Sequence, residues 1–230
     1  MEVQGGNMLE KIKGRLIVSC QALENEPLHS SFIMGRMALA AKEGGAVAIR
    51  AQGVNDIIEI RQVSQLPVIG IIKKEYPDSD IYITPTKLEV DQLLETKCEM
   101  IALDATSRKR PNNESLKELI ALIKSYDVLV MADISTYQEA LQAQELGADC
   151  VSTTLCGYTD YSTYFEGPNF ELIDQLVKEL TIPVIAEGKI NTPQDLEKVM
   201  QAGAYSAVVG GAITRPQLIC AKFNEVLEKK

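Results

Sequence analysis

The sequence is short of the residues that build metal centres and disulfide frameworks. Its 230 residues include one histidine, His29, and no tryptophan. Catalytic zinc and iron sites usually take two or three histidine ligands, so we expect no histidine-rich catalytic zinc or iron centre. The five cysteines are odd in number and contain no CxxC pair. Such cysteines are typical of reduced residues in the core of a cytoplasmic protein.

Positive charge and long apolar runs are lacking as well. There are 23 lysines and arginines against 32 acidic residues, which gives a net charge of −9. Nucleic-acid-binding proteins usually carry a basic patch, so we expect no nucleic-acid partner. No apolar run is long enough to span a membrane, and the N-terminus does not resemble a signal peptide. A small anion is still allowed, because a few N–H groups and one or two cations can hold a phosphate.

Eight short apolar runs follow one another along the chain. Most are continuous rather than alternating, which is typical of strands buried on both faces. The predicted strands are Leu16–Ser19, Ala46–Arg50, Val68–Ile72, Met100–Asp104, Val128–Asp133, Cys150–Thr153, Val184–Glu187 and Ala207–Gly210.

Segments with helical spacing separate these runs. One apolar stripe contains Leu116, Leu119, Ile120 and Ile123, and Thr192–Pro193 is a capped helix start. Eight strand–helix units predict a single-domain α/β protein, a closed (β/α)8 TIM barrel, which typically takes about 250 residues. We expect the barrel over residues 8–230, and residues 1–7 as a disordered or cloning-derived extension.

Charged residues stand where the apolar runs stop. In such a barrel the carboxyl ends of the strands meet at one face, where the active sites lie. Charges there need partners or a ligand, because unpaired burial costs several kcal/mol. The predicted strand ends carry Arg50, Lys73, Asp104, Asp133 and Glu187.

Two glycines after the last strand indicate a phosphate site. Gly210 and Gly211 precede a short helix start at 212–213, and Gly188 lies in the loop after the seventh strand. Glycine allows an anion to approach the backbone, and a helix start directs N–H groups at it. Loops after strands seven and eight often hold phosphate in TIM barrels. Arg215 could add a charged contact.

Lys73 and Glu187 are the candidates for acid–base chemistry. A partly desolvated lysine beside Arg50 would have a lowered pKa, and an ionised Glu187 would oppose that shift. A structural ion pair between Lys73 and Glu187 is the alternative. His29 is expected to be a hydrogen-bonded structural residue. The tyrosines of GYTDYSTY, in the loop after strand six, could form a lid or simply pack.

Several long motifs resemble the N-acetylmannosamine-6-phosphate 2-epimerase family of bacterial sialic acid catabolism. The resemblance runs from about Met8 to the C-terminus, and its motifs include SCQALENEPLHSSF, GIIKKEYPDSD, MADIST, IPVIAEGKINTP and YSAVVGGAITRP. It implies a (β/α)8 barrel that interconverts the 6-phosphates of N-acetylmannosamine and N-acetylglucosamine without a cofactor. A homodimer is also plausible for the family.

The resemblance also assigns roles to individual residues. It implies catalytic roles for Lys73, rather than Lys74, and for Glu187. The residues that it implies for substrate binding are Gln21, Arg50, Asp133, Gly188, Gly210, Gly211 and Arg215. Three other functions stay open: an aldolase with a Schiff-base lysine, a metal-dependent epimerase, and a sugar-phosphate sensor without catalysis.

Overall fold

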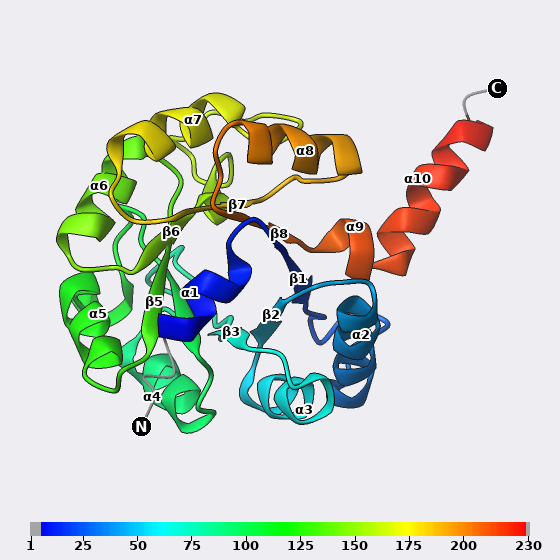
Figure 1. Ribbon diagram of the computed structural model, residues 1–230. Coiled ribbons are helices and arrows are strands. Elements are labelled where there is room, and N and C mark those ends of the chain that lie inside the picture. The colour runs from blue at the N-terminus through cyan, green and yellow to red at the C-terminus, as the bar shows by residue number, and fades with distance from the viewer. Residues whose placement is uncertain (1–5, 229–230) are drawn as a thin grey trace.

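Eight parallel strands form a closed barrel in sequence order, with β1 paired to β8. The computed structural model describes residues 6–228 and is a single (β/α)8 barrel, as the strand count predicts (Figure 1). The strands are β1 Leu16–Cys20, β2 Ala48–Gln52, β3 Val68–Ile71, β4 Met100–Asp104, β5 Leu129–Asp133, β6 Cys150–Ser152, β7 Val184–Glu187 and β8 Ser206–Val209.

Both faces of the strands are buried, which explains why the runs are continuous. Successive side chains of a strand point to opposite faces. Ile17 and Met131 belong to the apolar cluster that includes the barrel interior. Their neighbours Val18 and Val130 belong to the cluster shared with the surrounding helices. Each strand therefore needs apolar residues at odd and even positions alike.

The helices surround the barrel, and three of them begin at a threonine that caps the first turn. Thr86, Thr136 and Thr192 each form a capping box, and the predicted start at Thr192–Pro193 is confirmed. The barrel helices are α2 Ser31–Glu43, α3 Val54–Ser64, α4 Lys87–Glu95, α5 Leu116–Lys124, α6 Tyr137–Glu145, α7 Phe170–Glu179 and α8 Pro193–Gln201, with the 3-10 turns η1 Pro111–Asn113 and η2 Thr153–Leu155.

A short helix, α1 (Gly6–Ile12), closes the amino-terminal end of the barrel. It lies across the centre of the ring of strands in Figure 1. Met8 and Ile12 are fully buried in the interior cluster, and the Tyr205 hydroxyl donates to the Leu9 carbonyl at 3.1 Å. Of the extension expected over residues 1–7, positions 6 and 7 form the start of this helix, and positions 1–5 lie outside the described residues.

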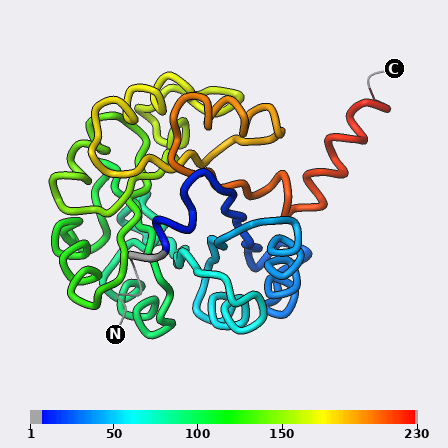
Figure 2. Tube along the Cα trace, viewed as in Figure 1, coloured from blue at the N-terminus to red at the C-terminus, as the bar shows by residue number. Residues whose placement is uncertain are grey.

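The chain ends in two helices after β8. The expected turn at 212–213 is confirmed as α9 (Gly211–Thr214), and α10 (Pro216–Glu228) projects away from the barrel (Figure 2). Five strands end at other residues than predicted. β1 and β2 continue to Cys20 and Gln52, whereas β3, β6 and β8 stop one residue early, so that Gly210 precedes α9.

Candidate functional site

A cavity of about 400 Å³ opens at the carboxyl ends of the strands. This volume lies in the range of small-molecule sites. Seven of the residues predicted from the sequence line it, namely Gln21, Lys73, Glu187, Gly188, Gly210, Gly211 and Arg215. The remaining two, Arg50 and Asp133, do not line the cavity themselves but bind residues that do.

Arg50 is the centre of a buried charge cluster beside the cavity. Its side chain is 1% exposed, and its two terminal nitrogens bind the two oxygens of Asp133 at 3.0 and 2.5 Å. The same guanidinium donates to Glu187 Oε2 at 2.8 Å. Burial disfavours the charged guanidinium, but these two carboxylates outweigh it and raise the pKa of Arg50.

The position of Arg50 corrects the prediction that β2 ends there. Ala51 and Gln52 continue the parallel pairing with Gly70 and Ile71 of β3. From the sequence alone, the partners of a charged residue are unknown, and a charge in an apolar run therefore indicates that the strand ends there. Here the partners come from β5 and β7, and they make the burial of Arg50 tolerable.

Glu187 connects this cluster to the cavity. It is the last residue of β7, and its side chain is 12% exposed. The Thr153 hydroxyl donates to its carbonyl oxygen at 2.9 Å, which fixes the backbone. Burial raises the pKa of Glu187, and the charge of Arg50 opposes that rise. Burial and the Arg50 charge therefore act on the pKa of this carboxyl group in opposite directions, with burial the larger cause.

Lys73 is one of three basic side chains that line the cavity, together with Lys189 and Arg215. Burial lowers the pKa of Lys73 from 10.5 to about 8. Arg50 and Arg215 act in the same direction, whereas Glu187 and Glu26 oppose it. Within residues 6–228 Lys73 makes no salt bridge, and Glu187 pairs with Arg50. The structural ion pair considered for Lys73 and Glu187 is therefore not formed.

The backbone after β3 separates Lys73 from its neighbour. Lys73 pairs with Ile83 in an isolated antiparallel bridge, and the Lys74 N–H donates to the Tyr82 carbonyl at 2.9 Å. This short hairpin directs Lys73 to the cavity, while Lys74 is exposed and does not line it. Of the two adjacent lysines, only Lys73 can reach a ligand held in the cavity.

The glycines and Arg215 gather at one side of the cavity. Gly188 has a φ of 98°, which favours glycine, and α9 begins directly after Gly210. Arg215 donates to both oxygens of Glu26 at 2.7 and 3.0 Å. Glu26, from the loop after β1, was not predicted, because it lies in a polar stretch without any local signal.

Other polar residues differ in their surroundings. Tyr82, which was not predicted, and Thr154, which follows the expected sixth strand, also line the cavity; the Thr154 hydroxyl donates to Asp133 at 2.8 Å. Asp104 ends β4 as predicted, but it binds Arg108 in its own loop at 2.6 Å and does not line the cavity. His29 Nδ1 lies 3.1 Å from the Ala22 carbonyl oxygen, consistent with a structural role.

The donor groups needed for a metal centre are not clustered in the part of the chain that the structure describes. No three His, Cys, Asp or Glu side chains between residues 6 and 228 are arranged to hold a metal ion. All five cysteines are free, and three of them are buried. No described helix has the length and apolar character required to cross a membrane.

Comparison with known proteins shows a close family resemblance. The profile of the family described as "Putative N-acetylmannosamine-6-phosphate epimerase" matches residues 34–229. Proteins called putative N-acetylmannosamine-6-phosphate 2-epimerase are 73% identical in Clostridioides difficile (96% of this chain, 99% of the relative) and 65% identical in Clostridium perfringens (96% and 100%).

Solved structures agree with the sequence comparison. The N-acetylmannosamine-6-phosphate 2-epimerase from Clostridium perfringens superposes with a TM-score of 0.94 at 64% identity, covering 95% of this chain and 96% of that one. A thiamine phosphate pyrophosphorylase from Pyrococcus furiosus has a TM-score of 0.62 at 20% identity, with 90% of each chain covered. The second likeness shows the barrel fold alone.

Proposed function

Since the chain belongs to the N-acetylmannosamine-6-phosphate epimerase family, we propose that it interconverts N-acetylmannosamine 6-phosphate and N-acetylglucosamine 6-phosphate. The observation that carries the proposal is the state of Lys73. This lysine lines the cavity, its pKa is lowered to about 8, and it has no salt-bridge partner within residues 6–228. A neutral amine in this position can accept a proton from a substrate carbon.

The two sugars differ only in configuration at C2. In the open-chain form C2 lies next to the aldehyde, and its proton becomes acidic when the carbonyl is polarised. Lys73 would take this proton and leave an enediolate-like intermediate. Addition of a proton to the opposite face of C2 gives the epimer. The Lys73 ammonium passes its proton to the group that donated this proton or to solvent, which regenerates the neutral amine. No electrons leave the substrate, so the step needs no oxidant or reductant.

Glu187 and Arg50 would serve the oxygen atoms of the substrate. Burial raises the pKa of Glu187, which suits a group that moves a proton at O1 or O5 during ring opening. Arg50 lies beside Glu187, and from there its positive charge would stabilise the developing oxyanion. Asp133 holds the Arg50 guanidinium in place. We propose sugar-binding roles for Gln21, Arg50 and Asp133 on these grounds.

The phosphate group would bind at Gly188, Gly210, Gly211 and Arg215. The first N–H groups of a helix have no partners within it, and those at the start of α9 border the cavity. Arg215, oriented by Glu26, lies beside them and carries a positive charge. Binding energy at the phosphate can orient C2 against Lys73, which lines the same cavity.

Proton NMR in heavy water tests the reaction directly. With N-acetylmannosamine 6-phosphate as substrate, we expect signals of the second epimer to grow while deuterium replaces hydrogen at C2. Binding without turnover would contradict the proposal and favour a sensor. Trapping of a covalent adduct by borohydride would favour a Schiff-base aldolase, and loss of activity with a chelator would favour a metal-dependent enzyme.

A homodimer is the assembly that we propose. Helix α10 projects from the barrel and exposes Phe223, Val226 and Leu227 by about 70% each. Apolar groups of this size on one projecting helix favour association, and a second copy would cover them. Light scattering should give twice the monomer mass for the wild-type protein, and the monomer mass for Val226→Glu. A monomeric wild-type protein would contradict the proposal.

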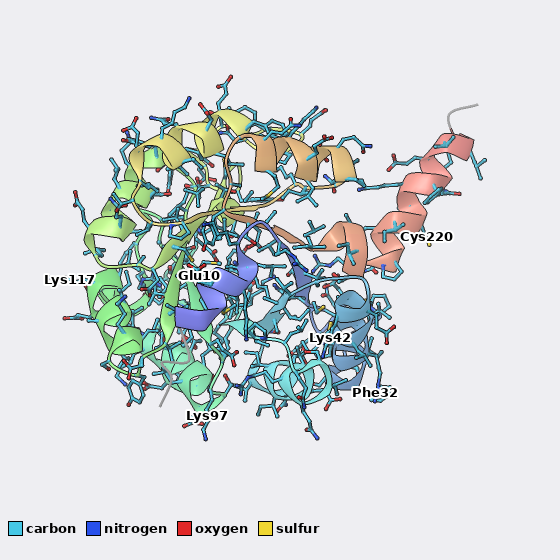
Figure 3. All side chains as sticks on the ribbon, viewed as in Figure 1. Glu10, Phe32, Lys42, Lys97, Lys117 and Cys220 are labelled. Carbon is cyan, nitrogen blue, oxygen red and sulfur yellow. The ribbon has the colours of Figure 1, made fainter. Side chains whose placement is uncertain are left out.

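We also propose that the enzyme works in the cytoplasm without a cofactor. All five cysteines are free, which suits a reducing compartment, and Cys220 on α10 is exposed to solvent (Figure 3). Full activity after exhaustive dialysis against a chelator is the expected result for a cofactor-independent enzyme. Fractionation of the producing cells would locate the protein.

A further inference from the structure

The loop between η2 and α7, residues 156–168 and here called the tyrosine loop, borders the cavity. Tyr158 lines the cavity, although half of its side chain is exposed. Tyr161 and Tyr164 are also exposed, by 50% and 71%. Exposed aromatic residues in a loop bury little surface, so packing alone contributes little to their position, and other contacts must fix the loop beside the site.

Lys189 holds the inner side of the tyrosine loop. Its ammonium lies 3.9 Å from the ring centre of Tyr164 and 5.0 Å from that of Tyr158. It also donates a hydrogen bond to the Phe165 carbonyl at 2.6 Å. Two aromatic faces and a carbonyl oxygen together form a cage for a cation.

The backbone on both sides is shaped around this contact. Lys189 has a φ of 57°, a left-handed conformation that non-glycine residues rarely adopt. Such strain persists where the surroundings impose it, and it is common at ligand clamps. On the loop side, a Cβ at Gly157 would lie 2.7 Å from the Lys189 ammonium, so the glycine leaves room for it.

The outer side of the tyrosine loop is fastened separately. The Tyr161 hydroxyl donates to Glu139 at 2.6 Å, at the start of α6, and accepts from Ser107 at 3.1 Å. Loss of the Lys189 contacts would therefore release the inner side alone. Lys189 directly follows Glu187 and Gly188, so it joins the loop to the turn that carries the candidate acid–base group.

We propose that Lys189 is a positioning residue that fastens the tyrosine loop over the cavity and holds the Tyr158 ring against the bound sugar phosphate. The role of the loop as a substrate cover rests on the proposed function, whereas the fastening itself does not. A covered sugar phosphate is retained longer and is shielded from water while the C2 proton is away.

Limited proteolysis and kinetics together test this inference. Chymotrypsin cuts after tyrosine and phenylalanine, and the tyrosine loop carries four such residues within 158–165. In Lys189→Met we expect cleavage there to be about tenfold faster and the KM for N-acetylmannosamine 6-phosphate about tenfold higher, with a smaller change in kcat. Lys189→Arg keeps a cation that stacks on aromatic rings and should restore most of both.

Matched variants make the outcome decisive. Lys198→Met removes a lysine over Phe170, 5.8 Å from the ring centre and away from the cavity lining, and should change neither readout. Tyr164→Leu removes one wall of the cage and should reproduce Lys189→Met even if that variant folds poorly. A raised KM with unchanged cleavage in Lys189→Met would overturn the inference, since Lys189 would then act only as a charge. If the wild-type protein does not epimerise, the proposed function fails, but cleavage still decides the fastening.

Discussion

The two ends of the barrel are built from the same eight strands but have opposite chemistry. At the amino-terminal end, α1 closes the interior with Met8 and Ile12, which are almost fully buried among apolar residues. At the carboxyl end, the interior opens into a cavity beside Arg50, Asp133 and Glu187. One end contributes stability, and the other holds charges in a partly desolvated site.

In β5 and β7 the change from apolar to charged takes place between two successive residues of the same strand face. Side chains two residues apart point to the same face of a strand. Met131 is followed on its face by Asp133, and Ile185 by Glu187. Met131 contacts the Arg50 guanidinium at 3.5 Å, so the apolar interior forms the floor of the charge cluster. The low-dielectric floor is one reason why the lysine and glutamate pKa values are shifted.

The largest expected effect is at the carboxyl end, on activity alone. Lys73→Met removes the proposed base, and epimerisation and C2 exchange should fall by about 1,000-fold or more, measured by NMR in heavy water. The free energy of unfolding should not fall, because a desolvated lysine is replaced by an apolar side chain of similar length. Lys74→Met is the control and should keep full activity. C2 exchange near the wild-type rate in Lys73→Met would refute the lysine role.

Asp133→Ala should affect both stability and activity. It leaves the buried Arg50 guanidinium without its bidentate partner, and breaking such a pair costs about 3–5 kcal/mol. Urea unfolding measures the loss. Asp91→Ala breaks an exposed pair with Lys87 and should cost no more than about 0.5 kcal/mol. Equal losses of unfolding free energy in the two variants would show that burial of the cluster does not increase its contribution to stability.

Ile12→Ala tests the amino-terminal end. Truncating this buried side chain should lower the free energy of unfolding by about 2–4 kcal/mol, because α1 loses apolar contacts and a cavity is left behind. The kcat at a temperature below unfolding should stay unchanged. Glu10→Ala, on the exposed side of α1, is the matched control (Figure 3). A reduced kcat in Ile12→Ala would show that the two ends are coupled.

Arg215→Met should weaken substrate binding. Loss of a charged contact to the phosphate should raise KM by about 10-fold to 100-fold with little change in kcat. The comparison is Arg36→Met, which removes an arginine that lies over Phe32 and is absent from the cavity lining. An unchanged KM in Arg215→Met would assign the phosphate to another part of the cavity.

The pH dependence should report the lowered pKa of Lys73. Only the neutral amine can accept the C2 proton, so kcat/KM should rise about tenfold per pH unit below pH 8 and level off above it. Arg215→Met removes a positive charge that lowers this pKa, and its profile should shift to higher pH. A profile that levels off only near pH 10 would mean that burial does not perturb Lys73.

Much of the fold could be predicted because strand and helix signals are local. The apolar runs, the stripe of α5 and the cap at Thr192 all depend on residues close together in the chain. The choice of Lys73 over Lys74 came from the motifs of the family, whereas the glycines after β8 were predicted from their place after the last strand. Helix α1 could not be predicted, since its two core residues stand in a short polar segment and are buried only by contact with the barrel interior.

The sequence by itself determined eight strands, their order and the residue types at the carboxyl end, because periodicity and chain direction require no knowledge of distant partners. Only the tertiary structure decided which charges meet. Arg50 binds Asp133 and Glu187, which are 83 and 137 residues away in the chain. Closure of the barrel brings both carboxylates within 3.0 Å of the Arg50 guanidinium and shifts the pKa values of Arg50 and Glu187, an effect that depends on distance and burial and that no local pattern encodes.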